Sequence, residues 1–197
     1  MIRQTVQCTR VNVAVNRVIS QMESSVSVDV STNDLSHQQG TVTADAFRAA
    51  MGHFLTGVTI VTTRSSSDTP YGLTVSSFNS VSLDPPLILW SLDLGNDRAN
   101  LFRESAGFTV NVLPSSCEGL IRTFAANDAE RFANTAWHWG VTGQPVLDDA
   151  IASFECRLWA EYPGGDHAIF VGEVMDIITR DGKAAAYFKG QLGTYPS

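Results

Sequence analysis

The stretch YGLTVSSFNSVSLDPPLILW, residues 71–90, decides the fold, because two apolar runs typical of β-strands flank a serine-rich segment in it. Residues 71–78 and 87–92 have the composition of strands, and Asp84-Pro85-Pro86 is typical of a turn. A strand with one wet face normally carries some charge there, yet this stretch contains no Lys, Arg or Glu. We therefore expect a bound partner, rather than water, against its hydroxyl-rich face.

Further strands are predicted on both sides of this stretch. The two longest flank a Pro-Gly-Gly-Asp turn and are predicted to form a hairpin. Six or seven strands joined by hairpins, with only brief helices, favour an antiparallel barrel over a parallel doubly wound sheet. The additional segments with strand composition are residues 58–63, 108–113, 152–162, 167–180 and 184–188.

A helix is predicted at the start of the folded part, over residues 43–57. Thr43 can cap it, and Gly57 can end it. Apolar residues recur at helical spacing between these two positions, namely Phe47, Met51 and Phe54 or Leu55. Short helices are also predicted over residues 97–105 and 117–126.

The chain of 197 residues is long enough for one well-cored domain, which we place at residues 43–197. Residues 1–42 are predicted to form a flexible extension, because they contain no aromatic residue and much Ser, Gln, Asn and Asp. Arginines in the first part of this extension are also compatible with a transit peptide or a short amphipathic helix. An upstream translation start or a mobile tail is the preferred interpretation.

Charge and cysteine usage restrict the partners. A net charge of −7 argues against a nucleic-acid binder and against an anionic membrane surface. The three cysteines are far apart and the four histidines are scattered, so neither a disulfide framework nor a metal site is expected. No apolar run is long enough to span a bilayer. A cytoplasmic, metal-free protein is predicted.

Several nucleotide and hydrolase motifs are missing from the sequence. It has no Gly-x-Gly-x-x-Gly after a strand, no phosphate loop, no Gly-x-Ser-x-Gly and no His-Glu-x-x-His. A nucleotide would therefore have to bind on a barrel.

A flavin suits residues 71–90, because short hydroxyls and backbone N–H groups can meet its ring edge and ribityl chain. Arg98 and Asn100, at the start of a predicted helix, suit its phosphate.

Six blocks of sequence resemble the flavin reductase family with the FMN-binding split barrel. These short-chain NAD(P)H:flavin oxidoreductases serve two-component monooxygenases and halogenases. The resemblance extends over about residues 45–195. Its blocks, in order, are TGVTIVTT, GLTVSSFNSVSLDPPLILWSL, FTVNVL, FAANDAERF, GQPVLDDAIASFEC and GGDHAIFVGEV.

The resemblance implies a mainly β fold, an antiparallel Greek-key split barrel of six to seven strands with short flanking helices. It implies reduction of FAD or FMN by NADH or NADPH, with hydride transfer from nicotinamide C4 to flavin N5. Such a transfer needs positioning rather than a strong acid or base. It also implies a homodimer that passes reduced flavin by diffusion to a monooxygenase or halogenase.

Site residues follow from the same resemblance. His167, in Gly-Asp-His, is implied on the nicotinamide side of the flavin, as the catalytic residue. The implied flavin-binding residues fall into three groups: Thr74, Val75, Ser76 and Ser77 at the ring edge and ribityl chain, Ser80 and Ser82 at the ribityl or phosphate region, and Arg98 and Asn100 at the phosphate. Phe124, Ala125 and Arg131 complete the set, the first two contacting the flavin or its adenine end through their backbone and the Phe124 ring.

Two other functions compete with the reductase. A flavin- or haem-binding split-barrel protein without catalysis would keep the hydroxyl-rich strand but could dispense with the nicotinamide side, so Gly165-Asp166-His167 favours the enzyme. A pyridoxamine-phosphate oxidase relative would need a cluster of Arg and Lys, which the 13 basic residues do not form in the sequence.

Overall fold

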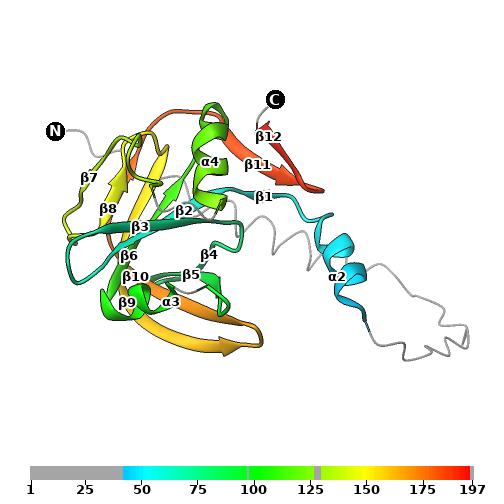
Figure 1. Cartoon of the computed structure of the whole chain (residues 1–197), viewed down its shortest axis with the longest axis horizontal. Helices are drawn as coiled ribbons and strands as arrows, with labels where there is room; N and C mark the ends of the chain where they lie inside the picture. Colours follow the sequence, from blue (N-terminus) through cyan, green and yellow to red (C-terminus); the bar gives the residue numbers. More distant parts are fainter. Residues whose placement is uncertain (1–41, 97, 127–129, 196–197) are drawn as a thin grey trace, which may run out of the picture. The chain divides into compact units, whose positions relative to one another are not determined.

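The computed structural model describes residues 42–96, 98–126 and 130–195, so the predicted extension lies outside the described residues except for Val42. Its centre is a seven-stranded antiparallel sheet with the order β3-β2-β6-β9-β10-β5-β4 (Figure 1). This confirms the predicted antiparallel split barrel. The strands are β2 (Thr59–Arg64), β3 (Pro70–Val75), β4 (Asn79–Leu83), β5 (Pro86–Asp93), β6 (Gly107–Val112), β9 (Ala152–Gly164) and β10 (His167–Thr179).

The two edge strands of this sheet, β3 and β4, follow each other in the chain. Residues 76–78, here called the seam segment, join them. The Ser77 hydroxyl accepts a hydrogen bond from the Ser91 backbone N–H at 2.9 Å and donates to the Ser91 carbonyl at 3.3 Å. The chain that leaves β3 is thereby attached to β5, and the predicted strand 71–78 is divided after Val75.

Smaller elements flank the barrel. A three-stranded sheet has the order β1-β11-β12, and β7 pairs with β8. The predicted short helices are present, although each is shorter than expected. The bounds are β1 (Thr56–Gly57), β7 (Trp137–Trp139), β8 (Pro145–Leu147), β11 (Ala184–Phe188), β12 (Gln191–Tyr195), α3 (Ala99–Glu104), a 3-10 turn (Ser115–Cys117) and α4 (Glu118–Ala125).

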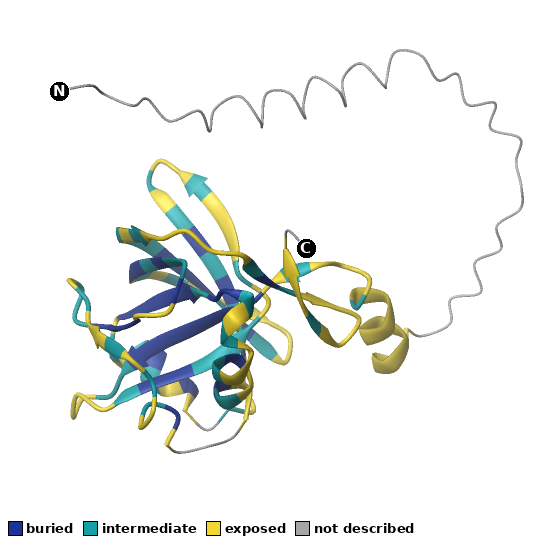
Figure 2. Cartoon of the chain, turned by 90° about the horizontal axis from the view of Figure 1, so that it is seen from above, coloured by how far each residue is buried: buried dark blue, intermediate teal, exposed yellow. Residues whose placement is uncertain are grey.

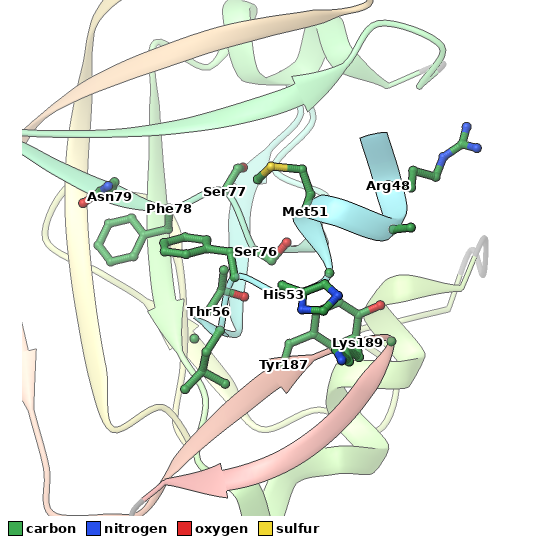
Figure 3. A pocket seen from close by; sticks show the side chains of 16 residues that line it. Arg48, Met51, His53, Thr56, Ser76, Ser77, Phe78, Asn79, Tyr187 and Lys189 are labelled. Carbon is green, nitrogen blue, oxygen red and sulfur yellow. The ribbon is translucent and has the colours of Figure 1, made fainter. Parts of the chain in front are cut away.

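The first described helix is α2 (Ala44–Met51), and the Thr43 hydroxyl caps it by accepting from the Ala46 N–H at 3.2 Å. The prediction that it extends to Gly57 is wrong. Gly57 lies in β1, extended against Ala186 of β11, so the helix has to end earlier, at Met51. Figure 3 shows His53, just beyond the helix, close to Tyr187 and Lys189.

The apolar side chains of this region are exposed, and α2 contains no buried residue (Figure 2). The exposed fractions are 59% for Phe47, 50% for Met51, 66% for Phe54 and 52% for Leu55. Within the described residues, no helix is both long and apolar enough to cross a membrane.

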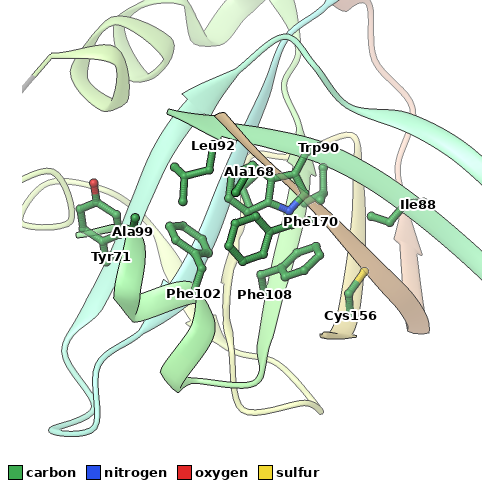
Figure 4. Close-up of a cluster of buried hydrophobic side chains, with 12 residues drawn as sticks. Tyr71, Ile88, Trp90, Leu92, Ala99, Phe102, Phe108, Cys156, Ala168 and Phe170 are labelled. Carbon is green, nitrogen blue, oxygen red and sulfur yellow. The ribbon is translucent and has the colours of Figure 1, made fainter. Parts of the chain in front are cut away.

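The interior of the barrel is built around Trp90 (Figure 4). Its ring stacks on Phe170 at 5.1 Å between centroids and meets the edges of Phe102 and Phe108 at 4.9 and 5.6 Å. Such aromatic groups contribute most of the apolar area that a small core buries. A second cluster, which includes Ile60, lies beneath α4.

The β9–β10 hairpin confirms the prediction from the Pro-Gly-Gly-Asp turn. Gly165 in this turn has φ +78°, a conformation that glycine adopts without steric cost. The strands pair from His167 opposite Gly164 to Thr179 opposite Ala152, with two irregularities in register.

Candidate functional site

Two adjoining cavities lie at the end of β3. The larger, about 980 Å³, is lined by α2, the seam segment and the turn between β11 and β12 (Figure 3). The smaller, about 610 Å³, is lined by β3, α4 and β12. Both include Ser76, Tyr187 and Gly190, so they meet at the C-terminal end of β3.

Five of the predicted flavin-binding residues are brought together here. Ser77 lines the larger cavity, and Ser76 lines both. The smaller cavity is also lined by Thr74, Val75 and Ala125. Because Ala125 comes from α4, the close packing of this helix on β3 determines the shape of the cavity.

The packing of α4 on β3 depends on a glycine and a hydroxyl. A Cβ at Gly72 would lie 2.8 Å from Cε1 of Phe124, so only glycine lets the ring come this close. The Thr74 hydroxyl donates to the Ile121 carbonyl at 2.8 Å. The Phe124 ring is 1% exposed and packs edge-on against Phe132 at 5.1 Å. The structure therefore places the Phe124 ring in the core and Ala125 at the cavity.

The two predicted serines of β4 lie apart from both cavities. Ser80 is exposed and pairs with Ile88, and Ser82 pairs with Leu87 of β5. The Ser82 hydroxyl accepts from the Asp84 N–H at 3.3 Å.

Arg98 and Asn100 line a third cavity, of about 330 Å³, beside Tyr71. The Arg98 guanidinium lies 5.2 Å from the centroid of the Tyr71 ring, and that of Arg131 lies 5.4 Å from the same centroid. Tyr71 is four residues before Val75, so this cavity and the paired cavities are about 13 Å apart along β3. A ligand that contacts both has to extend along the strand.

Arg131 is 8% exposed and is held by backbone carbonyl groups. Its Nη1 donates to the Gly72 carbonyl at 2.6 Å, and its Nη2 donates to the Ala126 carbonyl. Its Nε is buried and has no hydrogen-bond partner among the described residues. Arg131 therefore connects the chain after α4 to β3.

His167 begins β10 and pairs with Asp93 of β5, at the tip of the β9–β10 hairpin. Its Nδ1 lies 2.7 Å from Asp166 Oδ1, and this hydrogen bond holds the pKa of Asp166 below its usual value. The histidine side chain is 43% exposed and is not among the residues that line the two adjoining cavities.

An ion pair fixes α3 to the hairpin near this point. Arg103 makes a bidentate contact with Glu161, with Nε 2.9 Å from Oε2 and Nη2 2.7 Å from Oε1. The hydrogen bond from Arg103 lowers the pKa of Glu161. Arg103 also donates to Asn100 Oδ1 at 2.8 Å, which orients that predicted phosphate-binding residue.

Sequence reasoning missed the wall of the larger cavity that Tyr187, Lys189 and Gly190 form. Lys189 and Gly190 have φ +49° and +80°, and they form the two-residue turn of the β11–β12 hairpin. Two positive φ values are typical of a tight hairpin turn. The Lys-Gly pair after the predicted strand 184–188 was the signal that could have identified it.

Comparison with known proteins identifies the family to which this chain belongs. Residues 51–196 match the model of the flavin reductase like domain. An FMN reductase (NADH) of Agrobacterium fabrum is 41% identical over 150 residues, which cover 76% of this chain and 85% of that protein.

A second relative is the reductase component of the flavin-dependent trigonelline monooxygenase of Acinetobacter baylyi, 35% identical over 147 residues. The match covers 75% of this chain but 47% of that protein, so the chain spans about half of its length. Among solved structures, the flavin reductase component of a bacterial two-component tryptophan halogenase aligns with a TM-score of 0.72 and 35% identity. That alignment covers 79% of this chain and 99% of the other.

Proposed function

Because the chain belongs to the flavin reductase like domain family, we propose that it reduces flavin with NADH and supplies the reduced flavin to a partner monooxygenase or halogenase. The observation that carries this proposal is the pair of cavities around the hydroxyl-rich end of β3. The relatives are named as NADH-dependent reductases or as reductase components of two-component systems, which supports the same activity.

The residues around the cavities fit a flavin. Ser76 presents a short hydroxyl at the point where the two cavities meet, and Gly57 and Gly190 leave the wall open, since a Cβ at either would meet nothing within 4 Å. When bound, a flavin supplies a ring that accepts hydride from a nicotinamide. The chain contributes binding and orientation, which is what a near-attack geometry requires.

Within this proposal, the residues divide along β3. Val75, Ser76 and Ala125 hold the ring from the cavity wall, while Thr74 and Ser77 hold the backbone through their bonds to Ile121 and Ser91. Arg98 and Asn100, with Arg131 on the same Tyr71 ring, receive the phosphate. Ser80 and Ser82 are assigned to the ribityl or phosphate region by the resemblance alone, because they lie on β4, outside these cavities. His167 is assigned to the nicotinamide.

The test is NADH oxidation by the purified protein in air, followed by the absorbance of NADH with and without added FMN or FAD. Turnover that rises and saturates with free flavin supports a reductase that uses diffusible flavin. Comparison of FMN with FAD and of NADH with NADPH determines both preferences. Flavin binding without oxidation of either nucleotide would refute the reductase and support the binding-protein alternative.

A homodimer is part of the proposal, because the single chain leaves large apolar side chains exposed on α2 and on the β9–β10 hairpin. On the hairpin, the exposed fractions are 50% for Trp159, 52% for Met175 and 55% for Ile177. Exposed apolar patches of this kind mark interaction surfaces. A cytoplasmic location is also proposed, since both described cysteines are free thiols.

Sedimentation equilibrium tests the dimer. Phe47→Glu should shift the protein towards monomer, whereas Val141→Glu places the same charge on another exposed apolar residue and serves as the matched control. A wild-type protein that sediments as a monomer at all concentrations would refute the dimer.

A further inference from the structure

The larger cavity has a basic wall opposite the seam segment. Its lining includes Arg48, His53 and Lys189 and contains no Asp or Glu. The chain as a whole carries a net charge of −7, so the cavity differs in sign from the molecule around it. A local excess of basic groups in a cleft concentrates anionic ligands there.

Two of these basic groups are held in place by the fold. The Lys189 N–H donates to the Gly52 carbonyl at 2.9 Å, which joins the β11–β12 turn to the end of α2. Lys189 Nζ lies 5.5 Å from the centroid of the Phe188 ring, and the His53 ring meets the same ring edge-on at 6.4 Å. His53 and Lys189 are thus gathered around one aromatic side chain.

The charge of Lys189 is available to a ligand. Across the described ranges, no carboxylate forms an ion pair with Lys189. Arg48 differs, because it pairs with Asp45 at 2.8 Å, and Figure 3 shows its guanidinium directed away from the other labelled side chains. Lys189 is therefore the principal free cation of the wall, and the His53 ring nitrogens are its polar neighbours.

We propose that His53 and Lys189 bind the phosphate groups of the nicotinamide dinucleotide. The inference rests on the proposed function, in which the flavin ring lies at Ser76 and its nicotinamide donor has to approach from the open cavity. With the flavin against the seam segment, the opposite wall is the surface left for the donor. Lysine binds phosphate as a point charge, and a cavity of about 980 Å³ is at the upper end of small-molecule pockets, with room for more than one ring system.

The first test is Lys189→Gln. The KM for NADH should rise about five- to tenfold, while kcat and the dissociation constant for FMN stay unchanged. Lys183→Gln is the matched control, because Lys183 is the only other lysine in the sequence and does not line the cavity. Lys189→Arg keeps the charge and should restore most of the affinity for NADH.

The second test measures binding without turnover. Isothermal titration with NAD⁺ at low and high salt should show an affinity that falls as salt screens the phosphates. This salt dependence should be weaker in Lys189→Gln than in the wild type and in Lys183→Gln. A circular dichroism melt of each variant shows whether the fold is kept. If Lys189→Gln unfolds, Lys189→Asn replaces it, because asparagine also removes the charge and tolerates the positive φ of this position.

The outcomes separate this inference from the proposed function. If the wild type oxidises NADH and Lys189→Gln has the same KM and salt dependence, the wall does not bind the dinucleotide. If Lys189→Gln weakens FMN as strongly as NADH, but leaves riboflavin unchanged, the wall binds the flavin phosphate and the inference is wrong. If the wild type does not oxidise NADH, the proposed function fails. If the titration also shows no NAD⁺ binding, the inference that His53 and Lys189 bind the dinucleotide is refuted as well.

Discussion

Substitution of Gly72 by alanine tests whether the contact between α4 and β3 shapes the site. The new Cβ would lie 2.8 Å from Cε1 of Phe124 and 3.0 Å from Cγ2 of Thr62. Favourable carbon contacts lie at about 3.5–4.0 Å, so one side has to move by roughly 0.5–1 Å. The Phe124 ring is buried and packed against Phe132, and it can move only if α4 moves with it.

The expected cost follows from these contacts. Overpacking of a filled core destabilises by about 1–3 kcal/mol. Movement of α4 also lengthens the 2.8 Å hydrogen bond from Thr74 to Ile121, whose loss adds about 1 kcal/mol. Because Ala125 and Thr74 line the same cavity, flavin affinity should fall together with stability.

Urea denaturation measures the free energy of unfolding, and quenching of flavin fluorescence measures affinity. Gly119→Ala is the control on the same helix, because a Cβ there meets nothing within 4 Å. That variant should be as stable as the wild type, or more stable by up to about 1 kcal/mol. A Gly72→Ala protein with wild-type stability and flavin affinity would refute the argument that this contact is tight.

Three further predictions concern the seam segment, the Arg103–Glu161 ion pair and the Cys156 thiol. Ser77→Ala removes both hydrogen bonds to Ser91 and should destabilise the protein by about 1 kcal/mol. Ser66→Ala, in an exposed turn, is the control and should leave stability unchanged. Equal urea midpoints for the two variants would contradict a stabilising role of the seam segment. Glu161→Gln should lower stability at neutral pH by less than about 1 kcal/mol, because the pair with Arg103 is about one-third exposed. The pKa of Glu161 is lower in the folded state than in the unfolded state. The extra stability of the wild type over Glu161→Gln is therefore present above the unfolded pKa and is lost as pH falls through the folded pKa. A difference in stability that persists in stronger acid would be inconsistent with this pair. Burial and the nearby Glu155 raise the pKa of Cys156 to about 12, so peptide mapping after alkylation should find this thiol modified only in urea, and labelling of the native protein would disprove its protection.

Local signals in the sequence predicted much of the fold. The β9–β10 hairpin follows from a Pro-Gly-Gly-Asp turn between two long apolar runs, and the capping role of Thr43 follows from its place before an apolar helical pattern. Both depend on residues within a few positions of one another. The sequence is therefore sufficient to predict them.

Other features depend on contacts between distant segments. Helix α2 ends at Met51 because Thr56 and Gly57 pair with β11, more than a hundred residues later in the chain. Strand β4 has little β-forming composition of its own and pairs with β5 beyond the seam. The sequence could not indicate these bounds, since the partner strand decides them.

The candidate site shows the same limit. Residues 74–77 were predicted to contact a ligand, but only the structure shows that the hydroxyls of Thr74 and Ser77 are bonded to Ile121 and Ser91. The Lys189 wall comes from a hairpin turn that contains no family motif in the resemblance. A sequence pattern identifies the residue types at a site, whereas the neighbours of each side chain depend on the tertiary fold.

The seam segment restricts where new chain ends can be introduced by circular permutation. Each edge strand of an open sheet presents unpaired backbone groups to other molecules and promotes aggregation. Here β3 and β4 are tied by three residues, so new chain ends placed between Ser76 and Phe78 would release both edges at once. Circular permutation at this link should therefore give an insoluble protein, whereas new ends in the exposed Ser65–Thr69 turn leave the link intact. The same short link would then maintain both the solubility of the chain and one wall of the larger cavity.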